Sequence, residues 1–154
     1  MFTVSKIINA LIKKNISISV AESCTGGLIS HTLAKHIGVS KIFKCGIIAY
    51  SNKAKINYLS VSKKTLANHG AVSSNVALEM IENLYVKEKT DICVSTTGIA
   101  GPGGGSKYKP VGLVYVGIKY RKKKFIYEKN FVGDRKDIQR KTKDFIFYKI
   151  NQLI

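Results

Sequence analysis

Apolar side chains recur along the chain first with a helical period and then with a strand-like period. Apolar residues between positions 3 and 14 return every three or four positions, which predicts an amphipathic helix. Residues 16–20 alternate apolar side chains with serine and predict a strand, and residues 27–36 return to helical spacing. The apolar run at 43–50 predicts a buried strand, and the polar stretch at 51–60 predicts a turn-like connection.

The second half of the chain continues this alternation and adds a hairpin. The pattern predicts a short helix at 63–69, a longer helix from Ser73 or Ser74 to about Lys87, a strand at 91–97, a glycine-rich loop at 98–110, strands at 112–120 and 125–132, and a last helix from about Asp134. The final two strands flank a four-residue basic turn and should form a hairpin. We therefore predict a three-layer α/β/α fold, a mixed sheet with one C-terminal hairpin, and a single domain over residues 1–154.

Composition narrows the class of protein. Hydrophobic residues make up 45% of the chain and charged residues 23%, which is typical of a soluble globular domain. No apolar run reaches the ~18 residues that a membrane span requires. The segment Met1–Asn15 is interrupted by Lys6 and is followed by no small-residue cleavage site, so it does not resemble a signal peptide. We expect a cytoplasmic protein.

The formal net charge of +17 raises the question of nucleic-acid binding. Lysine is spread along the whole chain, and the only local basic run is Arg121–Lys124. We therefore expect the charge to attract a small anionic substrate and do not expect nucleic acid to be the main partner.

Cysteine and histidine give no sign of a metal site. Cys24, Cys45 and Cys93 are scattered without a CxxC pair, and the three histidines form no HxxxH or HExxH pair. We expect neither a metal nor another cofactor.

The strand at 16–20 runs into the sequence Ala21-Glu-Ser-Cys-Thr-Gly-Gly27, which opens the next helix. At such a break the first backbone N–H groups of the helix are unpaired and point outward, so they can bind an anion. Ser23, Cys24 and Thr25 are candidate nucleophiles beside them. The alternative is an ordinary helix cap, because Ser and Thr are the preferred residues there.

Three loops follow three predicted strands: 22–27, 50–55 and 97–109. If these strands are parallel, the loops converge at the carboxyl end of the sheet. A lysine of the second loop, Lys53 or Lys55, can then serve as a base for a serine if desolvation lowers its pKa. The alternatives are a solvated surface for both lysines and a core position for Tyr50.

The glycine-rich loop is neither a Walker motif nor a complete GxGxxG motif. Its consecutive backbone N–H groups would still offer a close approach to a carboxylate, phosphate or oxyanion. A flexible connection between strands is the alternative.

Six blocks of the sequence together resemble the C-terminal domain of the CinA proteins and its stand-alone form, nicotinamide-nucleotide amidohydrolase. They are Ala21-Glu-Ser-Cys-Thr-Gly-Gly-Leu28, Tyr50-Ser-Asn-x-x-Lys55, His69-Gly-Ala-Val-Ser73, Thr97-Gly-Ile-Ala-Gly-Pro-Gly-Gly-Gly105, Lys109-Pro-Val-Gly112, and Phe131-x-Gly-Asp-Arg135 followed by Arg140. The blocks cover nearly the whole chain in the expected order. The sequence shows no counterpart of the molybdopterin-binding-like N-terminal domain of longer CinA proteins, so we expect the stand-alone form.

The resemblance implies metal-free hydrolysis of the carboxamide of nicotinamide mononucleotide to nicotinate mononucleotide and ammonia. It implies that Ser23 is the nucleophile, Lys55 the base, and Tyr50 its hydrogen-bonding partner. The implied substrate-binding residues are Glu22, Thr25, Gly26, Gly27, Ser73, Thr97, Gly98, Gly101, Gly103, Arg135 and Arg140. The expected partner is a small nucleotide, and we expect a homo-oligomer. A catalytically silent nucleotide-binding module is the alternative.

Overall fold

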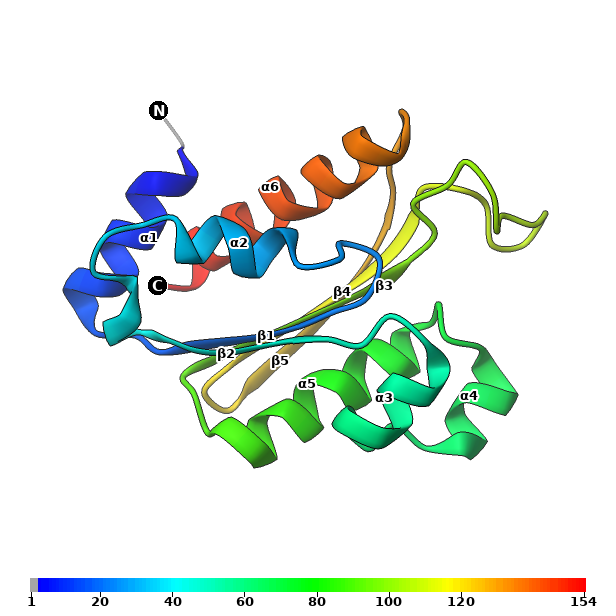
Figure 1. Cartoon of the computed structure of the whole chain (residues 1–154), viewed down its shortest axis with the longest axis horizontal. Coiled ribbons are helices and arrows are strands. Elements are labelled where there is room, and N and C mark those ends of the chain that lie inside the picture. The colour runs from blue at the N-terminus through cyan, green and yellow to red at the C-terminus, as the bar shows by residue number, and fades with distance from the viewer. Residues whose placement is uncertain (1–2) are drawn as a thin grey trace.

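The computed structural model describes residues 3–154, which form a five-stranded sheet between two layers of helices (Figure 1). Met1 and Phe2, which begin the segment considered above as a signal peptide, lie outside the described residues. The strand order is β2-β1-β3-β4-β5. This arrangement confirms the predicted α/β/α layers and the mixed sheet.

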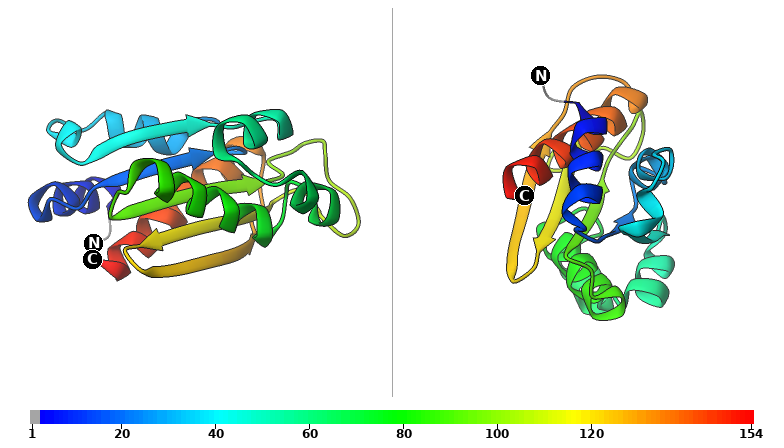
Figure 2. Two further views of the ribbon diagram at one scale, coloured as in Figure 1. Left: turned by 90° about the horizontal axis from the view of Figure 1, so that it is seen from below. Right: turned by 90° about the vertical axis from the view of Figure 1, so that its left-hand side faces the viewer.

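The sheet combines a parallel half with an antiparallel half. The parallel strands are β1 (Ile18–Glu22), β2 (Phe43–Ile48) and β3 (Ile92–Gly98). β4 (Leu113–Tyr120) runs antiparallel to β3, and β5 (Lys123–Asn130) pairs with β4 as the predicted C-terminal hairpin. Figure 2 shows the three parallel strands pointing toward the end of the sheet that also carries α3 and the glycine-rich loop.

One face of the sheet is covered by α1 (Val4–Lys14), α2 (Leu28–Ala34) and α6 (Arg135–Leu153). A short 3₁₀ helix, η1 (Val39–Lys41), leads from α2 toward β2. The apolar stripe of α1 packs into this layer, where Ile7, Ile8 and Leu11 are buried. The spacing of apolar residues thus predicts which side of the first helix faces the sheet.

The opposite face is covered by α3 (Asn52–Leu59), α4 (Lys63–His69) and α5 (Ser74–Glu88). α5 lies against the sheet with Val76, Met80 and Leu84 at intervals of four, and Ser73 caps it by accepting from the N–H of Val76. Among residues 3–154, no helix combines the length and apolar character needed to cross a membrane.

Three predicted elements differ from the structure. The stretch 51–60, expected to be turn-like, forms the helix α3, whose cap Ser51 accepts from the N–H of Ala54. The strand expected to be buried over 43–50 ends at Ile48 and lies at the edge of the sheet, with alternate residues exposed. The basic turn is shorter than expected, because β5 begins at Lys123 and leaves only Arg121 and Lys122 between the strands.

Candidate active site

Ser23 lies directly beyond the last residue of β1, where the backbone turns toward α2. Its backbone N–H donates to the carbonyl oxygen of Thr96 at 3.1 Å and to the hydroxyl of Thr96 at 3.2 Å. Ser23 is 7% exposed. The nucleophile candidate is therefore held by the neighbouring strand β3 and lies at the wall of a pocket, where only a small part of it reaches solvent.

The N–H groups at the start of α2 are not free, contrary to the expectation from the sequence. The buried carboxylate of Glu22 accepts from the N–H of Gly27 at 3.1 Å, of Ile29 at 3.1 Å and of Ser30 at 2.7 Å. Gly27 has a φ of +100°, which glycine adopts without strain and which turns its N–H toward this carboxylate. Glu22 thus occupies the anion site that the sequence predicted at the start of this helix.

Lys55 lies in the second turn of α3 and reaches the Ser23 turn from the adjacent loop. Its amine is 2.9 Å from the hydroxyl oxygen of Ser23 and donates to the carbonyl oxygen of Ala49 at 3.1 Å. The Lys55 residue is only 2% exposed, whereas its neighbour Lys53 is exposed. The structure therefore brings Ser23 and Lys55 together, and the solvated-surface alternative is wrong for Lys55.

Burial lowers the pKa of the Lys55 amine below its ordinary value, because the charged form loses its hydration. No carboxylate among the described residues forms an ion pair or hydrogen bond with this amine. A neutral amine has a lone pair and can accept a proton from the hydroxyl beside it. The site thus meets both requirements for a lysine base, contact with the hydroxyl and desolvation.

In contrast to the lowered pKa of the Lys55 amine, the pKa of the Cys24 thiol is raised. Burial raises the pKa of this thiol to about 12, so very little thiolate exists at neutral pH. Cys24 is 6% exposed, and its carbonyl oxygen accepts from the side-chain amide of Gln139 in α6. Of the two adjacent nucleophile candidates, Ser23 is the one whose side chain forms a hydrogen bond with the candidate base Lys55.

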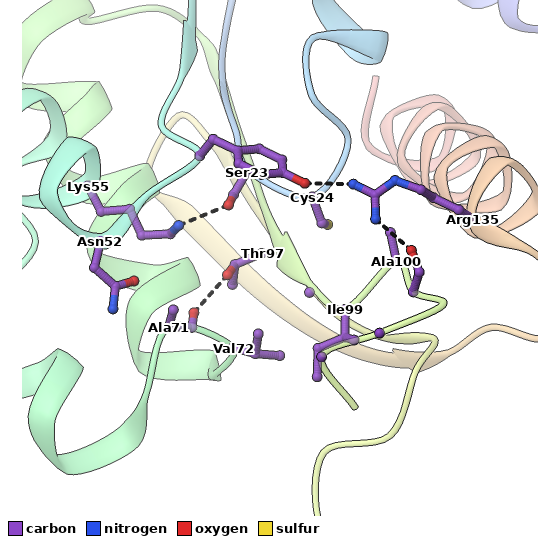
Figure 3. Close-up of a pocket in the computed structure, with 15 residues that line it drawn as sticks. Ser23, Cys24, Asn52, Lys55, Ala71, Val72, Thr97, Ile99, Ala100 and Arg135 are labelled. Carbon is purple, nitrogen blue, oxygen red and sulfur yellow. Dashed lines mark hydrogen bonds between the residues drawn. The ribbon is translucent and has the colours of Figure 1, made fainter. Parts of the chain in front are cut away.

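Arg135, the first residue of α6, joins two loops at the edge of the site (Figure 3). Its guanidinium donates to the hydroxyl of Tyr50 at 2.6 Å and to the carbonyl oxygen of Gly101 at 2.6 Å. Tyr50 therefore contacts Arg135 and forms no hydrogen bond with Lys55, which corrects the geometry that the resemblance implied. Tyr50 is also 58% exposed, so the core alternative is wrong for it.

These groups surround one pocket of about 250 Å³ at the carboxyl ends of the parallel strands. The predicted site residues that line it are Ser23, Tyr50, Lys55, Thr97, Gly98, Gly101, Gly103 and Arg135. Gly101 has a φ of +79°, and a Cβ there would come within 2.4 Å of the side chain of Val111, so the loop depends on glycine at this point. The charged side chains of the lining, Lys55 and Arg135, are both basic.

Other residues that the resemblance implied for substrate binding do not line this pocket. Glu22 and Thr25 are buried and hydrogen-bonded to each other, while Gly26 and Gly27 shape the turn behind Ser23. Ser73 is the cap of α5. Arg140 lies further along α6, where it pairs with Asp137 and Asp144. These residues have structural partners in the fold.

Sequence reasoning missed several residues of the site. Together with Cys24, the candidate next to Ser23, they complete the lining of the pocket: Asn52, Ala71, Val72, Ile99, Ala100 and Gly104. All six fall inside the quoted blocks, so the blocks located them without giving them a role. Thr96 carried no signal, because a threonine in an apolar strand is unremarkable until its partners are known.

The sequence of the chain is similar to known proteins over nearly its whole length. The sequence profile of the CinA C-terminal domain matches residues 2–154. A Clostridium botulinum protein named for competence and damage induction is 49% identical over 136 residues, covering 88% of this chain and 33% of that protein. A CinA-like protein of Fusobacterium nucleatum is 46% identical over 142 residues, or 92% of this chain and 34% of that protein. The chain thus spans about a third of the length of these curated relatives.

Solved structures show the same architecture. The competence/damage inducible protein CihA from Agrobacterium tumefaciens superposes with a TM-score of 0.92 at 34% identity, covering 99% of this chain and 98% of that one. A CinA superfamily protein from Escherichia coli gives a TM-score of 0.92 at 28% identity, covering 99% of this chain and 91% of that one.

Proposed function

The chain belongs to the CinA C-terminal domain family, and on that premise we propose that it hydrolyses the carboxamide of nicotinamide mononucleotide. The products are nicotinate mononucleotide and ammonia. Ser23 is the nucleophile and Lys55 the base. The observation that carries the proposal is the 2.9 Å contact between the Lys55 amine and the Ser23 hydroxyl in a desolvated site.

The first half of the reaction forms an ester on the protein. The hydroxyl oxygen of Ser23 attacks the carboxamide carbon, and its proton passes to the neutral amine of Lys55. The C–N bond of the tetrahedral intermediate then breaks, and Lys55 returns the proton to the leaving nitrogen, which departs as ammonia. Lys55 is neutral again when this half ends.

The second half consumes one water molecule. Lys55 takes a proton from the water as its oxygen attacks the ester carbon, and the proton then goes to the oxygen of Ser23 when the ester breaks. Cys24 lines the pocket, and residues 3–154 offer no hydrogen-bond acceptor on another residue for its backbone N–H, so this group is the donor we assign to the oxyanion.

The charge of the pocket suits the proposed substrate. Lys55 and Arg135 are the charged residues of the lining, and no acidic side chain among the described residues joins them. An anionic phosphate can approach this lining without repulsion from a carboxylate. The small volume near Ser23 is suited to the pyridine ring with its carboxamide, and the ribosyl phosphate would then extend toward Arg135.

Ammonia release from nicotinamide mononucleotide tests the proposal, with free nicotinamide and NAD as competing compounds. We expect steady release by the wild-type chain and none above background by Ser23→Ala, because the alanine variant lacks the attacking oxygen. Inhibition by either competitor would show which part of the nucleotide the pocket recognises.

Absence of ammonia in the wild type would contradict the proposal. If nicotinamide mononucleotide still bound, for example by calorimetry, the catalytically silent nucleotide-binding module would be the better description. A wild-type chain that neither bound nor hydrolysed the nucleotide would contradict both.

A further inference from the structure

A chain of hydrogen bonds runs behind the pocket from the backbone of Ser23 to the carboxylate of Glu22. The N–H of Ser23 donates to the hydroxyl of Thr96 at 3.2 Å, and that hydroxyl lies 2.8 Å from the hydroxyl of Thr25. The Thr25 hydroxyl in turn donates to the Glu22 carboxylate at 2.6 Å. All four residues are buried, and Glu22, Thr25 and Thr96 do not line the pocket.

The direction of every hydrogen in this chain is fixed by its ends. The Ser23 N–H can only donate, so the Thr96 hydroxyl oxygen accepts from it. At the other end Glu22 receives three backbone N–H groups and the Ser30 hydroxyl besides the Thr25 hydroxyl, which suits an acceptor-only carboxylate. Because Thr25 has one hydroxyl hydrogen and gives it to Glu22, the Thr96 hydroxyl must donate to Thr25.

We infer that Glu22, Thr25 and Thr96 are positioning residues that hold Ser23 in line with Lys55. The inference rests on the proposed function, in which the Ser23 oxygen attacks. Register within the sheet supports it, since Glu22 and Thr96 are direct neighbours on the paired strands β1 and β3. Glu22 also anchors the first turn of α2 through the N–H groups of Gly27, Ile29 and Ser30, so both sides of the Ser23 turn are tied to one carboxylate.

Lys55 and the hydrogen-bond chain contact different parts of Ser23. Lys55 contacts the side chain of Ser23, whereas the hydrogen-bond chain contacts its backbone. Removing the Thr96 hydroxyl leaves the Ser23 N–H bonded to the Thr96 carbonyl oxygen alone, at 3.1 Å. The turn then keeps the bonds from the Gly26 N–H to the Ser23 carbonyl oxygen and from Gln139 to the Cys24 carbonyl oxygen, but it loses its hydrogen-bonded link to Glu22 and can shift. Because a misplacement of about 1 Å can cost ~10²-fold in rate, even a small shift would slow attack.

The test compares Thr96→Val, which keeps the shape and removes the hydroxyl, with Thr96→Ser, which keeps the hydroxyl. Thr25→Val breaks the same chain one step further along and serves if Thr96→Val does not fold. Thr142→Val is the matched control, because Thr142 is equally buried but its hydroxyl donates to the carbonyl oxygen of Ile138 within α6. Unfolding by denaturant measures the stability of each variant separately.

Two rates are measured on folded protein: modification of Ser23 by a fluorophosphonate, located by peptide mass spectrometry, and ammonia release from nicotinamide mononucleotide. We expect Thr96→Val and Thr25→Val to slow both by about 10-fold or more through kcat, with KM changed by less than about threefold. Thr96→Ser should recover most of both rates, and Thr142→Val should match the wild type in both.

Wild-type rates in Thr96→Val and Thr25→Val, with only stability reduced, would overturn the inference and leave a purely structural role. Failure of Thr96→Ser to recover the rates would also overturn it. If the wild type is labelled at Ser23 but releases no ammonia, the proposed function fails, and the labelling rates still decide the positioning role. If the wild type shows neither reaction, Ser23 is not an activated nucleophile and both proposals fail.

Discussion

The amine of Lys55 lies 2.9 Å from the hydroxyl oxygen of Ser23, although 32 residues separate them in the chain. The contact arises because β1 and β2 are parallel neighbours, so the loops after them share one edge of the sheet. The Lys55 amine has a second partner in the carbonyl oxygen of Ala49 but no carboxylate, and burial lowers its pKa. The pair therefore has the contact and the desolvation that a serine with a lysine base requires.

Replacing Lys55 by arginine tests the base. Arginine keeps a positive charge but does not lose its proton in the accessible pH range, so we expect Lys55→Arg to lower turnover by about 10³-fold or more. In the wild type, turnover should rise with pH through the lowered pKa of Lys55. Lys53→Arg is the control, since Lys53 is exposed, and it should keep most activity. The measurement is kcat and KM over roughly pH 6–10; near wild-type turnover in Lys55→Arg would mean that the base lies elsewhere.

The pH dependence of the free energy of unfolding should also reflect the lowered pKa of Lys55. The folded pKa of Lys55 lies below the unfolded value of 10.5, so between these two values the unfolded chain binds more protons. The free energy of unfolding of the wild type should therefore rise with pH across that window, relative to Lys55→Met. Denaturant unfolding across this pH range measures it, with Lys53→Met as the control. Parallel curves for wild type and Lys55→Met would show that the amine stays charged.

We expect reagents that modify thiols to leave the candidate active site unmodified. Burial raises the pKa of Cys24 to about 12, and Cys24 is 6% exposed, whereas Cys45 is partly exposed on the edge strand β2. We expect limited treatment with iodoacetamide at neutral pH to label Cys45 first and to leave ammonia release unchanged. Peptide mass spectrometry identifies the labelled residue, and Cys45→Ser provides the control. Rapid labelling of Cys24 in step with loss of activity would argue for a reactive thiol.

Arg135 and Arg140 lie on the same helix, α6, so variants of the two arginines can be compared directly. Arg135 bonds to Tyr50 and Gly101 at the pocket, whereas Arg140 pairs with Asp137 and Asp144 outside it. Lysine cannot replace the two-armed contact of a guanidinium, so Arg135→Lys should raise KM by about 10-fold or more. Arg140→Lys should stay near wild type. The reverse order of effects in steady-state kinetics would restore Arg140 to the substrate site that the sequence resemblance implied.

The order of elements and the meeting of three loops follow from the sequence because they depend on apolar periodicity and on parallel pairing. The helix α3 was missed for a physical reason. Its buried residues are Leu59 and Lys55, and a lysine counts as polar in any hydrophobic pattern. The residue that hides the helix is the one we propose as the base, so the failure of the pattern coincides with the functional site.

Glu22 was misjudged for a related reason. A glutamate after a strand is usually solvated, and only the folded structure shows it buried against the N–H groups of α2. The exposure of Tyr50 was equally hidden, because the end of β2 at Ile48 cannot be read from a continuous apolar run. In each case the deciding factor is a contact between distant segments, which local patterns do not encode.

The most direct measurement is the rate of ammonia release from nicotinamide mononucleotide by Ser23→Ala and Cys24→Ala, compared with the wild type. The account predicts a loss of about 10³-fold or more for Ser23→Ala, because the oxygen beside the Lys55 amine is gone. Cys24→Ala should lose less than about 10-fold, since its protonated thiol takes no part in the reaction. Retained activity in Ser23→Ala together with loss in Cys24→Ala would contradict the central claim.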